Sequence, residues 1–209
     1  MMKINSVASR PDRAGRHTVR FEDDSVLRLY RQTIEDFGLY AGLELSDEQM
    51  KQLQTAAGAM SAKMRAVRIV AASSVSVKDL EQRLIHKGED PMQAKEAVNW
   101  MRDMHLVDDR ETARQIVNRC IGKGYGLSRA KQALFEKRIP KELWDEVLDD
   151  YPDQMDAIVS FLHSRINESS EQKDIRKAID ALLRKGHSYH LIRRGLEQLA
   201  LDSEEFPED

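Results

Sequence analysis

The sequence of 209 residues is poor in cysteine and lacks long apolar runs. Its single cysteine, Cys120, excludes an intramolecular disulfide and a metal site built from several cysteines, and fits a buried, inert thiol. No apolar run approaches the roughly 20 residues that a membrane-spanning helix needs, and residues 1–16 lack the apolar core of a signal peptide. We therefore expect a cytoplasmic protein that works in a reducing compartment, away from membranes.

Neither positive nor negative charge is present in large excess. The 33 Lys and Arg residues face 36 Asp and Glu, giving a formal net charge of −3. This balance excludes a generally basic nucleic-acid-binding surface but allows local basic patches. The sequence has no Ser/His/Asp triad, paired carboxylates or nucleotide-binding motif. We predict a binding protein that is not an enzyme, with no catalytic residues, no cofactor and no metal.

Residues 1–57 are predicted to form an N-terminal extension. Two short β-prone runs, at 18–22 and 25–29, flank a pair of aspartates that tolerate tight-turn conformations, so they predict a β-hairpin. An isolated hairpin is only marginally stable in water and must pack on a helix. Residues 31–37 could form that helix, which would end at Gly38.

A longer helical pattern begins at a capping box, in which Ser46 is followed three residues later by Gln49. Apolar residues then recur at alternating steps of three and four. This pattern fits either a coiled-coil dimer seam or two helices that each bury one face in their own chain. We favour two helices broken near Gly58, because alanine and methionine make a poor zipper. The recurring residues are Met50, Leu53, Ala57, Met60, Met64, Val67 and Ala71.

The rest of the chain contains an internal repeat, with copies offset by 50 and 48 residues. Its clearest segments are 80–88, 130–138 and 178–186. Each has a small or apolar residue, a leucine four positions later and a lysine three positions after that. The three leucines, which are Leu84, Leu134 and Leu182, are therefore predicted to be buried at equivalent positions. The register continues through Ala94, Trp144 and Ile192, then Val98, Leu148 and Leu196, then Met101, Tyr151 and Leu199.

The repeated positions fall on one face of two consecutive helices, so each copy is predicted to contain three helices. Units of this size have little core of their own and need neighbouring copies to stack on them. The predicted fold is mainly α: three tandem three-helix repeats in an elongated curved array, after a small extension of β-hairpin and helix. We place the repeats at residues 58–107, 108–151 and 152–201, followed by an acidic tail at 202–209.

The central residues resemble the signature of the RecX family. These are Leu106-Val107-Asp108-Asp109, Arg119 and the run from Lys123 to Leu134. Residues 76–88 are similar to the first repeat of that family, and the hairpin and residues 38–45 are similar to an extension that some members carry. The resemblance implies a protein that binds the RecA nucleoprotein filament, mainly as an inhibitor. It also implies effects on ATP hydrolysis, strand exchange and coprotease activity, in homologous recombination, DNA repair and the SOS response.

Two positions depart from the family pattern. Arg138 stands where the family usually has a glycine, so we expect it to lengthen its helix or to add a charge to the surface. Ser73 and Ser74 replace a position that is often basic.

Residues 110–138 carry a local net charge of +6, from eight basic residues against Glu111 and Glu136. We predict that they form a contact surface for an acidic groove or for DNA phosphate. The alternative is a solvated helix surface, and the scarcity of acidic residues in this segment disfavours that interpretation. Residues 176–194, with six basic residues against Asp180, have the same interpretation. The eight residues are Arg110, Arg114, Arg119, Lys123, Arg129, Lys131, Lys137 and Arg138.

Two other motifs have structural interpretations. Gly124 and Gly126 fit a helix-to-helix turn better than a phosphate-binding loop, because no strand precedes them. His187 and His190 have the spacing of metal ligands, but no third ligand lies near them in the sequence. They are therefore predicted to be surface residues at the start of a helix.

Two other functions remain open beside that of a RecA-filament regulator. One is a DNA-binding helical module that contacts single- or double-stranded DNA without sequence preference. The basic residues spread over several predicted helices rather than one recognition helix, which favours filament binding or non-specific phosphate contact. The other is a coiled-coil scaffold, which the expected monomeric state would exclude.

Overall fold

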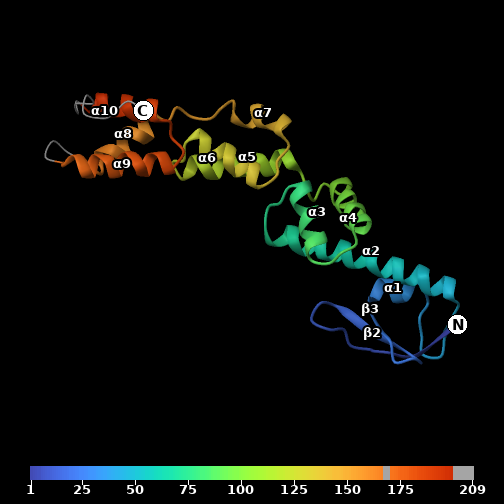
Figure 1. Ribbon diagram of the computed structural model, residues 1–209. Coiled ribbons are helices and arrows are strands. Elements are labelled where there is room, and N and C mark those ends of the chain that lie inside the picture. Colours follow the sequence, from blue (N-terminus) through green and yellow to red (C-terminus); the bar gives the residue numbers. More distant parts are fainter. Residues whose placement is uncertain (167–169, 200–209) are drawn as a thin grey trace. The chain divides into compact units, whose positions relative to one another are not determined.

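The computed structural model of the protein describes residues 1–166 and 170–199. The chain divides into two compact units, Met1–Val107 and a second that begins at Asp108. It is mainly helical with a small N-terminal antiparallel sheet, as predicted (Figure 1). The predicted acidic tail, residues 202–209, lies outside the described residues, as do the last two residues of the predicted third repeat. The elongated curved array stays a prediction.

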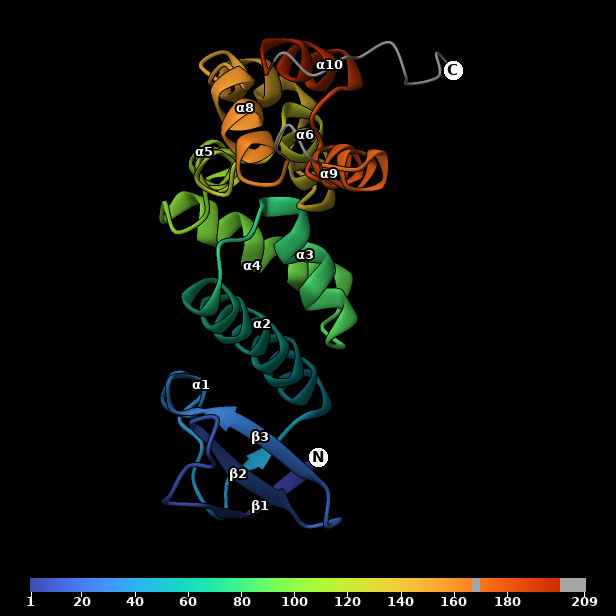
Figure 2. The ribbon, with the colours of Figure 1, turned by 90° about the vertical axis from the view of Figure 1, so that its left-hand side faces the viewer.

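A four-stranded antiparallel sheet opens the first unit (Figure 2). The strands are β1 (Met2–Val7), β2 (Arg16–Phe21), β3 (Val26–Tyr30) and β4 (Glu44–Leu45), in the order β3-β2-β1-β4. β2 and β3 form the predicted hairpin, in which Val19 lies opposite Leu27. The sequence prediction missed β1 and β4. β4 has only two residues, and it pairs with β1 from more than forty residues away.

The sheet packs on α1 (Arg31–Asp36) and on the first half of α2 (Asp47–Ala72). Alternate strand residues point to the same side of a sheet, and this side carries the apolar ones. Val19 and Phe21 of β2 and Leu29 of β3 are buried there together with Leu53 of α2. The hairpin is therefore supported by helices, as the sequence required.

The helix α2 begins at the predicted capping box. The Ser46 hydroxyl accepts a hydrogen bond from the Gln49 amide (3.1 Å), and the Ser46 amide donates to the Gln49 side chain (2.9 Å). The helix then continues for 26 residues, so the prediction of two helices broken near Gly58 was wrong. Gly58 lies where α4 (Pro91–Asp103) approaches closely, and a Cβ there would overlap the Gln93 side chain. The predicted boundary between residues 57 and 58 falls inside this helix.

The second half of α2 packs with α3 (Val77–His86) and α4 in the core of the first repeat. Ser76 accepts from the Asp79 amide (3.0 Å) to cap α3, and Asp90 accepts from the Met92 amide (2.9 Å) to cap α4. The buried residues include Ala62, Ala66, Leu80, Leu84, Ala94, Val98 and Met101. The helix α2 thus packs within its own chain, in two successive cores, through Leu53, Ala62 and Ala66. The predicted stripe was correct only in part, because Met64 and Ala71 are exposed.

The second unit contains the other two repeats. The second repeat has α5 (Asp109–Gly122), α6 (Leu127–Glu136), a 3-10 turn η1 (Lys141–Leu143) and α7 (Trp144–Leu148). The third has α8 (Met155–His163), α9 (Gln172–Arg184) and α10 (Tyr189–Gln198). Each has its own apolar core, one around Val117 and Leu134 and the other around Leu162 and Leu182.

The repeat register is confirmed at its three leucines, since Leu84, Leu134 and Leu182 are all 0% exposed. In each copy this leucine's carbonyl accepts from the amide five residues later, at 3.0–3.1 Å. The residue before that amide takes a left-handed conformation, as in a Schellman helix end. Two of these residues are glycines, with φ of +88° and +87°, whereas Arg138 has φ +54°.

The prediction that Arg138 lengthens its helix was therefore wrong. The helix α6 ends at Glu136, and Arg138 ends it in the same backbone conformation as the glycines of the other copies. The other expected outcome is observed, because Arg138 is exposed and adds its charge to the surface.

Candidate functional site

The candidate site is the basic segment, residues 110–138, which forms α5, α6 and the turns after them. These two helices pack on each other in the core of the second repeat (Figure 1). The eight basic residues are exposed, apart from Arg129 and Lys137, which are half-buried. The helix α5 carries Arg110, Arg114 and Arg119, the next turn Lys123, α6 Arg129 and Lys131, and the turn after it Lys137 and Arg138.

The basic residues of α5 do not share one face. Arg110 and Arg114 are about one turn apart and lie side by side. Arg119 comes nine residues after Arg110, about two and a half turns at 3.6 residues per turn, so it lies on the opposite side. The basic segment therefore presents at least two separate surfaces.

The two arginines that lie side by side share a carboxylate. Glu146 of α7 is 3.1 Å from both Arg110 and Arg114, one through each carboxylate oxygen. Arg129 also has a partner, Glu136, at 3.7 Å. The expected scarcity of acidic partners was therefore wrong for three of the eight residues. Two of them pair with Glu146, which lies beyond residues 110–138, and Arg129 pairs with Glu136 within that range. These pairs are exposed, so each contributes at most about 1 kcal/mol.

Three of the remaining cations are less neutralised. Among the described residues, none forms an ion pair with Arg119, Lys123 or Lys131, which are all exposed. The Lys123 ammonium lies 5.9 Å from the centre of the Tyr125 ring, a cation–π arrangement. These three side chains are the cations of the segment best placed to meet an anionic partner.

The turn between α5 and α6 is closed to a phosphate. Its three central amides, those of Gly124, Tyr125 and Gly126, all donate to protein carbonyls at 2.9–3.0 Å. The acceptor for Gly126 is Lys185, at the end of α9, and a Cβ on Gly126 would overlap the carbonyl of Gly186. The prediction of a helix-to-helix turn is confirmed, and Gly126 lets the second and third repeats come into contact.

The same contact buries a histidine that was predicted to be exposed. His187 is 4% exposed, its Nε2 lies 3.2 Å from the Gly124 carbonyl, and its Nδ1 lies 3.1 Å from the Gln154 side-chain oxygen. The surface prediction was wrong for His187 and correct for His190. Burial lowers the pKa of His187, and the positive charge of Lys185 contributes, against the raising effect of the Gly124 hydrogen bond.

The sequence analysis missed Phe135, whose side chain is 67% exposed. It follows the buried Leu134 on α6, so it lies off the apolar face of the helix. Lys131 precedes it by four residues on α6, which places one cation about one turn away. An apolar residue outside the repeat's buried positions is the sequence signal that could have revealed it.

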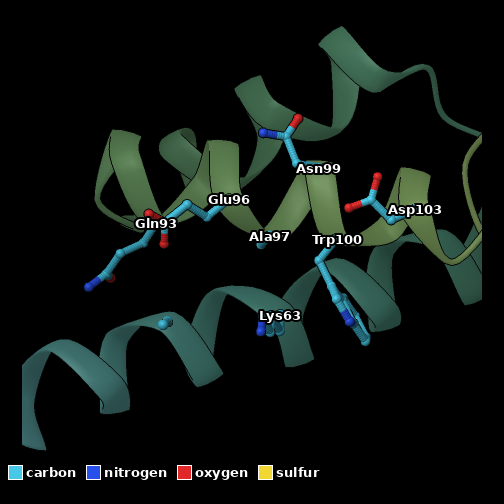
Figure 3. A pocket seen from close by; sticks show the side chains of 8 residues that line it. Lys63, Gln93, Glu96, Ala97, Asn99, Trp100 and Asp103 are labelled. Carbon is cyan, nitrogen blue, oxygen red and sulfur yellow. The ribbon is translucent and has the colours of Figure 1, made fainter.

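The first unit has a small open pocket between α2 and α4, of about 250 Å³ (Figure 3). The Trp100 ring points from α4 toward α2, and the Lys63 ammonium lies 5.5 Å from its centre. The pocket is lined by Ala59, Lys63, Gln93, Glu96, Ala97, Asn99, Trp100 and Asp103. These residues include no histidine, cysteine or serine that could act as a nucleophile with its base.

Further observations concern metals, membranes and the cysteine. Within residues 1–166 and 170–199, no group of three His, Cys, Asp or Glu side chains could hold a metal ion. None of the helices in these ranges is long and apolar enough to cross a membrane. Cys120 is buried, as predicted, and its burial raises the pKa of the thiol.

Comparisons with known proteins match this architecture. Residues 108–148 match the family "RecX, second three-helix domain". A "Regulatory protein RecX" of Clostridioides difficile is 22% identical over 202 residues, which are 94% of this chain and 95% of that protein. A protein of the same name from Vibrio parahaemolyticus is 22% identical over 140 residues, covering 66% of this chain and 90% of its own.

Two solved structures have the same fold. A "Crystal structure of regulatory protein RecX" aligns with a TM-score of 0.64 and 18% identity, over 96% of this chain and 99% of that one. The structure of RecX from Lactobacillus salivarius aligns with a TM-score of 0.60 and 22% identity, over 69% of this chain and 98% of that one.

Proposed function

The chain belongs to the RecX family, and from this premise we propose that it regulates the RecA recombinase, mainly as an inhibitor. It binds the RecA–DNA filament as a cytoplasmic monomer and modulates ATP hydrolysis, strand exchange and coprotease activity. It needs no cofactor. The observation that carries the proposal is the position of the basic segment. Its +6 charge lies within residues 108–148, which match the second RecX domain, on a chain whose net charge is −3.

The contact is proposed to use Arg119, Lys123 and Lys131, which are exposed and form no ion pair with another described residue. Exposed cations of this kind attract an acidic partner over about 8 Å at physiological ionic strength, and added salt screens them. Arg110 and Arg114 contribute less, because both already pair with Glu146. Salt should therefore weaken the inhibition.

The test is titration of the protein into RecA filaments that hydrolyse ATP on single-stranded DNA. The parent protein should slow hydrolysis, and the triple variant Arg119→Glu, Lys123→Glu, Lys131→Glu should do so much less. All three residues are exposed, so folding should change little, by about 0.5 kcal/mol per site.

A matched control changes the same total charge elsewhere. The variant Lys51→Glu, Lys78→Glu, Lys95→Glu replaces three exposed lysines of the first unit. It should inhibit nearly as well as the parent, apart from a general effect of net charge. We call the triple variant of Arg119, Lys123 and Lys131 the basic-segment variant. If it inhibits RecA as strongly as the parent, the contact lies elsewhere on the protein.

The second candidate function is non-specific DNA binding, and the same +6 charge favours it. For a protein of this kind the logarithm of the affinity falls linearly with the logarithm of the salt concentration, because phosphates that bind the protein release counterions. If inhibition and binding to RecA-free DNA fall together in the basic-segment variant at every salt concentration, sequestration of DNA is the better explanation.

A further inference from the structure

The pocket between α2 and α4 has an aromatic ring flanked by two carboxylates (Figure 3). Glu96, Trp100 and Asp103 all lie on α4, spaced four and three residues apart, so each carboxylate is about one helical turn from the ring. Both carboxylates are exposed, and none of the residues that the structure describes forms an ion pair with either. Their charges are therefore available to a cation that approaches the pocket.

The repeat does not require an aromatic ring at this position. Trp100 follows Gly88 by twelve residues, and the equivalent residues of the other two repeats are Asp150 and Gln198, which are exposed and polar. The three-helix scaffold is thus formed twice without an aromatic side chain there. In the first repeat the ring packs partly against the core and also lines the pocket. Packing alone does not account for the side that lines the pocket.

The ring of Trp100 already holds a cation of its own chain. The Lys63 ammonium of α2 lies 5.5 Å from the centre of the ring, within the roughly 6 Å of a cation–π interaction. This contact shows that positive charge is attracted to the ring. Lys63 has a flexible four-carbon stem, so its ammonium can move into solvent when another cation takes its place.

The size of the pocket suits a single side chain. The hollow exists because Ala59 and Ala97 are small, and Gln93 closes one end, where its amide nitrogen donates to the Thr55 carbonyl of α2 (3.3 Å). Its volume of about 250 Å³ lies below the roughly 300–1,000 Å³ of pockets that take a whole small molecule. The pocket can therefore take one long side chain that enters from solvent.

We propose that this pocket binds an arginine side chain presented by a protein partner, with the guanidinium stacked on Trp100 and held by Glu96 and Asp103. A guanidinium is planar, stacks on aromatic rings and forms charge-assisted hydrogen bonds with carboxylates. In binding, it displaces the Lys63 ammonium from the ring. A nucleic acid fits poorly, because the two carboxylates repel phosphates.

This site goes beyond the proposed function, because it is a second surface of opposite charge to the basic segment. The pocket belongs to the first unit and the basic segment to the second. One is suited to a cationic side chain of a protein and the other to a polyanion. The test of the pocket contains no RecA, so either proposal can fail without the other.

The test uses the ¹⁵N-labelled full chain and the peptide acetyl-Ala-Arg-Ala-amide, with binding followed by NMR of the amide and indole N–H groups. The indole signal of Trp100 should shift in a saturable way as the peptide is added. The indole of Trp144 lies in the second unit, so it should not shift and serves as an internal control. The same peptide with citrulline in place of arginine has nearly the same shape without the charge, and it should not bind.

Three variants test the roles of the charges. Glu96→Gln combined with Asp103→Asn should weaken binding of the arginine peptide by up to about 5-fold for each carboxylate. Lys63→Met keeps an apolar side chain but removes the competing ammonium, so it should tighten binding about 2- to 5-fold. The matched control, Glu22→Gln combined with Glu44→Gln, removes two exposed carboxylates of the same unit and should leave binding unchanged. Thermal unfolding should show that all of the variants are folded.

Any of five outcomes would overturn the proposal. Three concern the ligand: no shift of the Trp100 indole with the arginine peptide, an equal shift with the citrulline peptide, or a saturable shift of this indole with oligothymidylate, which would mean that the pocket takes a nucleic acid. The other two concern the variants: unchanged binding after loss of Glu96 and Asp103, or weaker binding by Lys63→Met, which would mean that Lys63 builds the site rather than competes for it.

Discussion

Replacing Gly126 with alanine should destabilise the second unit more than replacing Gly124, although both lie in the same turn. Gly126 has φ −75°, which any residue can adopt, but a Cβ there would overlap the carbonyl of Gly186. Gly124 has φ +62°, and no atom lies within 4 Å of a Cβ placed there. One position needs glycine for space and the other for its backbone conformation.

The magnitude follows from the contacts that alanine at position 126 would break. The chain around Gly186 must move away, which breaks the hydrogen bond from the Gly126 amide to Lys185 (2.9 Å) and separates His187 from the Gly124 carbonyl. A hydrogen bond contributes about 0.5–1.5 kcal/mol, and a buried polar group left without a partner costs about 1–3 kcal/mol. The expected loss is therefore about 2–4 kcal/mol.

Gly124→Ala should cost less. The left-handed conformation costs an alanine about 1–2 kcal/mol, and the lower entropy of the unfolded chain returns about 0.4–1 kcal/mol. The expected net loss is about 1 kcal/mol. Gly122→Ala is the neutral control, because Gly122 lies at the end of α5 with open space around its Cβ position and no positive φ.

Urea unfolding measures the three variants in a Trp100→Phe background, so that the fluorescence comes from Trp144. This residue belongs to the second unit, where its indole donates to the Ile139 carbonyl. The midpoint should fall most for Gly126→Ala and not at all for Gly122→Ala. If Gly124→Ala lowers the stability as much as Gly126→Ala, close packing between the two turns is refuted.

Three further predictions use the same structure. Leu134→Ala should lower stability by about 2–5 kcal/mol in urea unfolding, whereas Phe135→Ala should cost under about 1 kcal/mol; similar losses would contradict the repeat register. The pKa of His187 lies below its ordinary value of 6.5, so unfolding takes up a proton at acidic pH. The contribution of His187 to the free energy of unfolding is therefore complete above pH 6.5 and is lost as the pH falls toward the lowered pKa. His187→Gln should remove this loss, and an unchanged pH profile of unfolding would exclude His187 as its source. Glu146→Gln should release Arg110 from its ion pair and tighten binding to DNA measured by anisotropy, unless that side of α5 takes no part.

The sequence predicted the helices and their register because the decisive signals are local. The three leucines recur with the same neighbours, and the capping residues Ser46 and Asp90 lie within three positions of the amides that they accept from. Interactions of this range depend on the helix alone, so they can be recognised before the tertiary structure is known.

The errors come from contacts between distant residues. Gly58 lies inside a continuous helix, at a place where α4 approaches too closely for a side chain, which no local pattern indicates. Glu146 neutralises two arginines that precede it by more than thirty residues. His187 is buried by the turn that contains Gly124, 63 residues earlier in the chain. In each case tertiary packing determined the outcome.

The candidate site was predictable in part, for a related reason. Charge can be counted along a sequence, so residues 110–138 stood out, but charge alone does not separate paired cations from available ones. The repeat provides the missing comparison, because its copies meet the same packing demands at equivalent positions. Phe135 is exposed, as is Leu183 at the equivalent position of the third repeat, whereas Ile85 of the first repeat packs against the core. Arg138 departs from both other copies, since it takes φ +54° where they have Gly88 and Gly186. The second repeat therefore has the scaffold of the other two and differs from both of them in the residue that ends α6.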